Sequence, residues 1–286
     1  MSSLSNQPHN FIGCGCGFDE ADVVLFGAPF DSTTSFRPGA RFAPPAIRGD
    51  SFGIETYSPY LDKDLTDCHV MDSGDLELPF GDVTAALRLI EARTDLIAQS
   101  GKVPVMLGGE HLVTLGVIRA LARLHPDLQL IHFDAHADLR DDYLGQGLSH
   151  ATVMRRVYDL LDDGRISQFG IRSGEQMEFA FAKAHTNMQR LNFDGLAETV
   201  ARLRDKPVYF TLDMDVLDPS VFPGTGTPEP GGVSFEALLA AVHALKGLKI
   251  VGCDVVELSP HYDHSGISTA AACKILREIL LILGGA

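Results

Sequence analysis

Ile131-His-Phe-Asp-Ala-His-Ala-Asp138 is an apolar strand end followed by carboxylate and imidazole side chains at alternate positions. In an extended chain, residues two apart point to the same face, so Asp134, His136 and Asp138 can converge on one point beyond the strand. Such side chains are common ligands of divalent metals. On its own the octet could also be a solvated turn, so its interpretation depends on the rest of the chain.

Two further apolar runs end in residues of the same kind. Residues 103–107 lead into Gly108-Gly-Glu-His111, and residues 209–212 lead into Asp213-Met-Asp215. Three predicted strand ends therefore each supply a carboxylate or an imidazole. The candidate metal ligands are His111, Asp134, His136, Asp138, Asp213 and Asp215.

Apolar runs of strand length alternate with amphipathic stretches of helix length from residue 22 onward, a rhythm typical of a parallel sheet covered by helices. We expect strands at 23–26, 69–72, 103–107, 128–133, 166–169, 188–191, 208–212 and 249–256. We expect helices at 82–99, 112–124, 151–161, 176–184, 193–203, 234–245 and 268–283. The pattern predicts an α/β fold with one mostly parallel, eight-stranded sheet, whose ligands bind at the carboxyl ends of the strands.

The 286 residues contain no linker rich in Pro, Gly and Ser and no internal repeat, so we expect a single domain over 1–286, with 1–20 as an N-terminal tail. The net charge of −15 argues against nucleic acid and anionic membranes as partners and mildly favours a cationic ligand.

Five cysteines without a CxxC pair suit a reducing compartment, and Cys14-Gly-Cys16 is only a weak zinc signal. Without a signal peptide or a long uncharged apolar run, we expect a cytoplasmic protein.

Six candidate ligands exceed the needs of one tetrahedral metal. Four carboxylates with two imidazoles form an oxygen-rich set that suits manganese or magnesium better than a structural zinc. If Asp134 and Asp213 each bridge, two metals can share the six residues. Four carboxylates crowded together without cations would repel one another strongly, so the cluster itself favours bound metal.

The three motifs 108–111, 134–138 and 213–219 resemble the metal motifs of the ureohydrolases, a family that includes arginase, agmatinase and guanidinobutyrase. The segments that are similar to agmatinase segments in particular are 36–42, 148–150, 169–174, 223–227 and 254–258. The resemblance implies an arginase-like three-layer sandwich. It also implies a homo-oligomer of the trimer or hexamer type.

For the site, the resemblance implies two Mn²⁺ per chain. One is held by His111, Asp134, Asp138 and Asp213, and the other by His136, Asp134, Asp213 and Asp215, with Asp134 and Asp213 bridging. A hydroxide shared by the metals then attacks the guanidino carbon. The implied catalytic residues are Asp138, which accepts hydrogen bonds, His150, which shuttles a proton, and Glu257, which pairs with the guanidinium. His132 is more plausible as a partner of a ligand than as a ligand.

The predicted reaction is the cleavage of a small guanidino substrate, agmatine, to urea and putrescine. The acidic candidates for holding its cationic amine are Asp141, Asp142 and Glu175. Arg140 argues for the first alternative, guanidinobutyrate or another guanidino acid, because it would favour a carboxylate tail if it faced the pocket. A deacetylase on a related fold and a catalytically silent homologue are further alternatives. We expect Glu110, where many arginases have Asp, to be a neighbour of the ligands and not a ligand itself.

Overall fold

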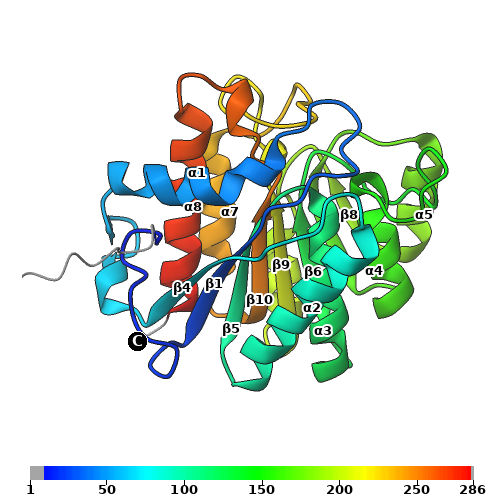
Figure 1. The fold of residues 1–286 in the computed structure, drawn as a ribbon. Coiled ribbons are helices and arrows are strands. Elements are labelled where there is room, and N and C mark those ends of the chain that lie inside the picture. Colours follow the sequence, from blue (N-terminus) through cyan, green and yellow to red (C-terminus); the bar gives the residue numbers. More distant parts are fainter. Residues whose placement is uncertain (1–9, 285–286) are drawn as a thin grey trace, which may run out of the picture.

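The computed structural model describes residues 10–284 and contains a central sheet of eight strands in the order β4-β1-β5-β10-β9-β6-β7-β8 (Figure 1). The strands are β1 (Val23–Ala28), β4 (Val70–Asp75), β5 (Val103–Gly108), β6 (Gln129–Phe133), β7 (Ile166–Ile171), β8 (Asn187–Arg190), β9 (Pro207–Asp213) and β10 (Lys249–Val256). Within residues 10–284, each pair of neighbours in this sheet is parallel. The predicted fold class is confirmed, and the sheet is parallel throughout where the sequence pattern predicted a mostly parallel one.

Helices cover both faces of the sheet and make three layers (Figure 1). One face carries α1 (Ala43–Asp50), α6 (Leu196–Leu203), α7 (Phe235–Ala244) and α8 (Ile267–Leu283). The other carries α2 (Val83–Gln99), α3 (Thr114–Leu124), α4 (Val153–Leu161) and α5 (Gln176–His185). Alternation along β1 explains the two layers of core, because Val23 and Leu25 pack into the first cluster while Val24 and Phe26 pack into the second.

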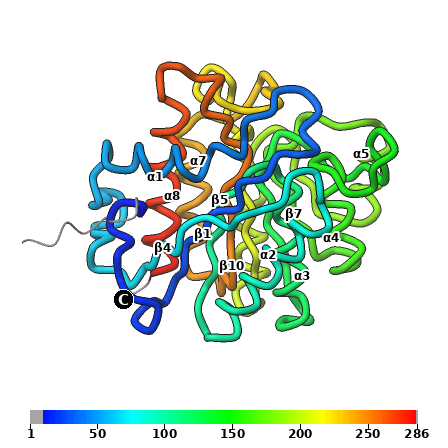
Figure 2. Tube along the Cα trace, in the orientation of Figure 1, coloured from blue at the N-terminus to red at the C-terminus, as the bar shows by residue number. Residues whose placement is uncertain are grey.

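Helix α1 was not among the predicted elements. It begins with Pro44 and Pro45 in its first turn, a dipeptide that usually signals a loop. Proline is tolerated there because the first amide groups of a helix have no partner within the helix. Helix α1 packs beside α8, so the first and last helices lie together on one face (Figure 2). The short hairpin of β2 (Tyr57–Ser58) and β3 (Lys63–Asp64) was also not predicted.

Residues 10–20 of the expected N-terminal tail run along the outer edge of β4, whereas residues 1–9 lie outside the described residues. The amide of Cys16 donates to the carbonyl of Val70, and Phe11 and Cys14 are buried. An uncovered edge strand presents free amide and carbonyl groups to other chains. This segment therefore protects part of the sheet edge.

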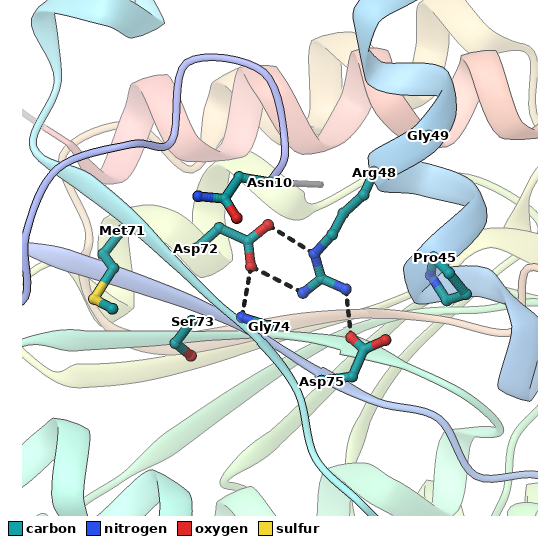
Figure 3. A pocket seen from close by; sticks show the side chains of 9 residues that line it. All are labelled: Asn10, Pro45, Arg48, Gly49, Met71, Asp72, Ser73, Gly74 and Asp75. Atoms are coloured by element: carbon teal, nitrogen blue, oxygen red, sulfur yellow. Dashed lines mark hydrogen bonds and ion pairs between the residues drawn. The ribbon is translucent and has the colours of Figure 1, made fainter. Parts of the chain in front are cut away.

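An ion-pair network ties α1 to the same edge, beside a cavity of about 590 Å³ (Figure 3). Arg48 donates from Nε and Nη2 to the two carboxylate oxygens of Asp72, at 2.7 and 2.9 Å, and pairs through Nη1 with Asp75. Asp72 also accepts from the amide of Phe11 at 2.8 Å. Because these groups satisfy one another, we interpret the network as structural.

The strands that lead to the predicted site residues are neighbours at the centre of the sheet, in the order β5, β10, β9, β6, with β10 leading to Glu257 and the other three to the predicted ligands. Their register aligns Leu107 with Val255 and Leu212 with Phe133, so their carboxyl ends reach the same edge. Residues that follow these ends are thereby brought together although they are far apart in sequence. Within residues 10–284, no helix is long and apolar enough to cross a membrane.

The end of β5 approaches the loop after β1 so closely that only glycine fits at position 109. A Cβ atom on Gly109 would lie 1.8 Å from the carbonyl oxygen of Phe30, whereas one on Gly147 would have no described atom within 4 Å. We expect Gly109→Ala to lower the free energy of unfolding by about 3 kcal/mol, because the backbone must shift. The control Gly147→Ala should change it by less than about 0.5 kcal/mol. Denaturant unfolding of the two variants tests this, and equal stabilities would contradict the close approach.

Candidate metal and catalytic site

The structure brings the six predicted ligands together beyond the ends of β5, β6 and β9. His111 Nδ1 lies 3.0 Å from Asp134 Oδ2, 3.3 Å from Asp213 Oδ2 and 3.4 Å from Asp138 Oδ2. His136 Nδ1 lies 3.0 Å from Asp215 Oδ2 and 3.5 Å from Asp134 Oδ1. Asp134 therefore lies between the two imidazoles.

The hydrogen bonds of His111 determine which of its nitrogens carries the proton. Thr211 Oγ1 donates its one hydrogen to Asp254 Oδ1 at 2.6 Å and lies 2.9 Å from His111 Nε2. Thr211 must therefore accept from Nε2, so in the neutral ring the lone pair is on Nδ1. Although burial lowers the pKa of His111, its contacts with Asp134, Asp138 and Asp213 raise it well above the usual value, so the carboxylates attract either a proton or a metal to this position. This Nδ1 is buried and has no hydrogen-bond partner among residues 10–284, although three carboxylates face it. Such an arrangement is stable when a cation lies between the lone pair and the carboxylates.

Two sets of three side chains bring potential ligand atoms within 4.8 Å of one another. They are His111, His132 and Asp134, and Asp134, His136 and Asp215. Asp134 belongs to both sets. The residues present thus fit a metal centre built around this carboxylate.

His132 supports Asp134 and does not offer a free nitrogen. The side-chain amide of Gln168 donates through Nε2 to the carbonyl of Ala137 at 2.9 Å and to His132 Nδ1 at 3.1 Å. Since Nδ1 accepts, the proton of His132 is on Nε2, which donates to Asp134 Oδ2 at 2.7 Å. Histidines and carboxylates in this relation orient metal ligands and raise their basicity.

The carboxylates of the cluster are crowded. Burial, followed by the charge of Asp134, raises the pKa of Asp138 to about 6. Burial and the charges of Asp215 and Asp134 raise the pKa of Asp213 well above its usual range. These shifts express the repulsion that bound cations would relieve.

Asp138 and Glu257 have left-handed backbones, with φ of 54° and 66°. Non-glycine residues rarely adopt this conformation, and strain of this kind, about 1–3 kcal/mol per residue, is typical of functional sites. The two predicted catalytic carboxylates are thus held in unusual positions by the surrounding structure.

A pocket of about 200 Å³ lies over the cluster. Its lining includes Ser35, Asp138, Arg140, His150, Asp213 and Glu257, so the three predicted catalytic residues share one cavity. Glu257 Oε1 accepts from the amide of His111 at 2.7 Å. His150 Nε2 lies 3.2 Å from the hydroxyl of Ser35.

His150 is positioned by contacts that the sequence did not reveal. Its amide donates to Thr33 Oγ1 at 3.0 Å, and that hydroxyl donates to Glu110 Oε1 at 2.8 Å. Glu110 also accepts from the amide of Thr33 and the hydroxyl of Thr34, at 2.9 and 3.1 Å. Glu110 therefore anchors the loop after β1 beside His150. The only sequence signal for this role was the place of Glu110 next to His111.

Burial lowers the pKa of His150 to about 4. The ordinary pKa of an imidazole is near 6.5, and the pKa of His150 is lower because most of its side chain is removed from solvent. His150 is consequently neutral at neutral pH.

The three acidic candidates for holding the substrate tail lie in different places. Asp141 pairs with Arg156 at 2.6 Å, and Asp142 accepts from the amide of Gly145 at 2.8 Å in an exposed turn. Glu175 pairs instead with Arg140, a residue of the pocket wall. Glu175 is therefore the candidate with a direct connection to the pocket.

The cysteines show no sign of a metal site. Cys14 is buried and Cys16 is half-buried, and both are free thiols. Among residues 10–284, the groups able to hold a metal include neither of them.

Comparisons with known proteins agree with this geometry. The model of the arginase family matches residues 21–282. The agmatinase of Bacillus subtilis (strain 168) is 47% identical over 95% of each chain. The guanidinobutyrase of Pseudomonas aeruginosa is 35% identical and covers 100% of this chain and 93% of its own. The crystal structure of the agmatine ureohydrolase of Thermoplasma volcanium superposes with a TM-score of 0.87, at 36% identity, over 96% of this chain and 94% of that one.

The shared position of Asp134 gives a test of the metal centre. In Asp134→Asn one carboxylate is lost from both sets of ligands, so we expect the affinity for Mn²⁺ to fall by at least about 100-fold at both positions. The measurement is metal per chain after equilibrium dialysis against Mn²⁺, with the fold checked by circular dichroism. Asp142→Asn, at an exposed turn, serves as the control and should bind metal like the wild type. Retention of two metals by Asp134→Asn would rule out a shared ligand.

Proposed function

The chain belongs to the arginase family of ureohydrolase enzymes, and we propose that it hydrolyses the guanidino group of agmatine to give urea and putrescine. The observation that carries this proposal is the buried Nδ1 of His111, which has no hydrogen-bond partner among residues 10–284 and faces three buried carboxylates, two of which, Asp138 and Asp213, line a small pocket. The match to an agmatinase along most of the chain supports the choice of substrate.

The ligand set supports a pair of manganese ions. We assign one to His111, Asp134, Asp138 and Asp213, and the second to His136, Asp134, Asp213 and Asp215. When bound, such ions lower the pKa of a coordinated water and so make a strong nucleophile available near neutral pH. The oxygen-rich set favours manganese over zinc.

Glu257 is suited to bind the guanidinium group of the substrate. One of its oxygens, Oε1, accepts from the amide of His111, which orients the carboxylate in the pocket wall. Burial and the charge of Glu110 raise the pKa of Glu257 well above its usual range, so a cationic partner is strongly favoured beside it. A carboxylate matches the planar donors of a guanidinium.

Hydrolysis adds the oxygen of water to the guanidino carbon, breaks one C–N bond and requires a proton on the departing amine. Asp138 accepts a hydrogen bond from the attacking water or from the tetrahedral intermediate. His150 is a neutral imidazole at neutral pH, with one nitrogen that accepts and one that donates, so it can relay a proton from solvent to the amine nitrogen through its two nitrogens. The hydroxyl of Ser35 near Nε2 provides a route toward the pocket mouth.

Guanidinobutyrate is the second candidate substrate, because Arg140 lines the pocket and could bind a carboxylate. It needs the same chemistry at the guanidino end. We favour agmatine because Arg140 is already paired with Glu175 and Glu178, at 3.2 and 3.4 Å, which offset its charge.

Urea release from agmatine, arginine and guanidinobutyrate at equal Mn²⁺ tests the substrate. We expect kcat/KM for agmatine to exceed that for arginine by at least about 10²-fold, because an α-carboxylate left unpaired in a closed pocket is strongly disfavoured. The kcat/KM for agmatine should also exceed that for guanidinobutyrate. A higher value for either acid would refute the choice of agmatine and leave the ureohydrolase chemistry in place.

The role of His150 is tested by His150→Asn, which removes the titrating ring. We expect kcat to fall by about 10² to 10⁴, the usual contribution of a general acid or base, with metal content unchanged. His185→Asn is the matched control, since this imidazole pairs with Asp163 away from the pocket. An unchanged kcat in His150→Asn would exclude the proton shuttle.

A further inference from the structure

Arg140 occupies the pocket wall with its charge matched by two carboxylates. Nη1 lies 3.2 Å from Glu175 Oε1, and Nε lies 3.4 Å from Glu178 Oε2. The guanidinium also stacks on Tyr143, with 4.6 Å between its carbon and the ring centroid, and Tyr143 lines the pocket as well. The plane of the guanidinium is therefore held in place beside the cavity.

The two carboxylates differ in what else they do. Glu178 is buried, accepts from the amide of Leu139 at 2.9 Å and accepts from the amide of Glu175 at 2.7 Å. It thus links the start of α5 to the loop that follows Asp138. The side chain of Glu175 is 60% exposed, and the ion pair with Arg140 is the salt bridge that it forms within residues 10–284. The carboxylate of Glu175 also accepts from the backbone amide of Glu178 in the N-terminal capping box of α5, so a substitution that keeps an acceptor oxygen leaves the wall intact.

The charge of this part of the wall depends on Glu175. Arg140 contributes one positive charge and the two glutamates contribute two negative charges, which leaves one net negative charge. Such a wall favours the cationic amine of agmatine over a carboxylate. Without the charge of Glu175, this part of the wall becomes neutral, and the charge of Arg140 is offset by Glu178 alone.

We propose that the Glu175–Arg140 ion pair determines which substrate tail the pocket accepts. With the pair intact, Arg140 is masked and the pocket selects a cationic amine. With the pair broken, Arg140 receives the carboxylate of a guanidino acid through its planar donors. This inference rests on the proposed ureohydrolase function and assigns the tail specificity of the same pocket to one pair of residues.

Glu175→Gln tests the inference, because glutamine keeps the shape and the capacity to accept a hydrogen bond but removes the charge. We expect kcat/KM to fall about threefold for agmatine and to rise about threefold for guanidinobutyrate, the size of a partly exposed charge contact. The ratio of the two values should therefore change about tenfold. This ratio does not depend on the fraction of active protein, so partial loss of fold or metal does not imitate the effect.

Asp141→Asn is the matched control. It makes the same change in net charge on the adjacent loop, but Asp141 pairs with Arg156, which is not among the described residues that line the pocket, whereas Glu175 pairs with Arg140, which is. In Asp141→Asn the ratio of kcat/KM for agmatine to kcat/KM for guanidinobutyrate should stay within about twofold of the wild-type value. A change equal to that of Glu175→Gln would assign the effect to the general field of the protein and overturn the inference.

A second variant identifies the group that receives the carboxylate. In the double variant Glu175→Gln with Arg140→Gln, the gain with guanidinobutyrate should disappear. A gain that persists, or an unchanged ratio in Glu175→Gln when the wild type hydrolyses agmatine, would overturn this inference alone. Absence of urea from every guanidino compound in the Mn²⁺-loaded wild type would instead overturn the proposed function.

Discussion

The rest of the site depends on the concentration of buried carboxylates around Nδ1 of His111. The hydrogen bonds from His111 through Thr211 to Asp254 fix the ring so that Nδ1 faces Asp134, Asp138 and Asp213. An apolar core could not tolerate that arrangement without compensation, because buried like charges are costly. The carboxyl ends of the central strands are therefore suited to hold cations.

A further set of contacts, made by Glu110, positions the loop after β1 and His150 beside this cluster. Glu110 is buried behind the ligands, and burial raises its pKa to about 7 although Thr33 and Thr34 stabilise the ionised form by hydrogen bonds. Those bonds fasten the loop after β1 against the end of β5. Through the hydroxyl of Thr33 the same contact positions the amide of His150. The identity of residue 110 thus affects the geometry of a group 40 positions further along the chain.

The sequence predicted the sheet and the clustering of the candidate ligands because both follow from local periodicity. Side chains two apart at a strand end share a face, and parallel topology brings strand ends to one edge. Helix α1 was missed because Pro44-Pro45 resembles a loop when its place in the first turn is unknown. The contact between Thr33 and Glu110 joins residues 77 positions apart, and no local pattern encodes it. The lowered pKa of His150 likewise follows from enclosure, which only tertiary structure provides.

The charge of the pocket wall depends on which charged side chains pair with one another, and the number of acidic residues nearby does not determine it. The loop after Asp138 contains Asp141 and Asp142, and the chain carries a net charge of −15, yet neither fact describes the wall that a substrate meets. Asp141 pairs with Arg156 and Asp142 accepts from a turn amide, whereas Arg140 in the wall is offset by two glutamates. Exposed charges are screened within about 10 Å, so distant acidity contributes little. Selection between an amine and a carboxylate tail is therefore a property of the few groups around Arg140.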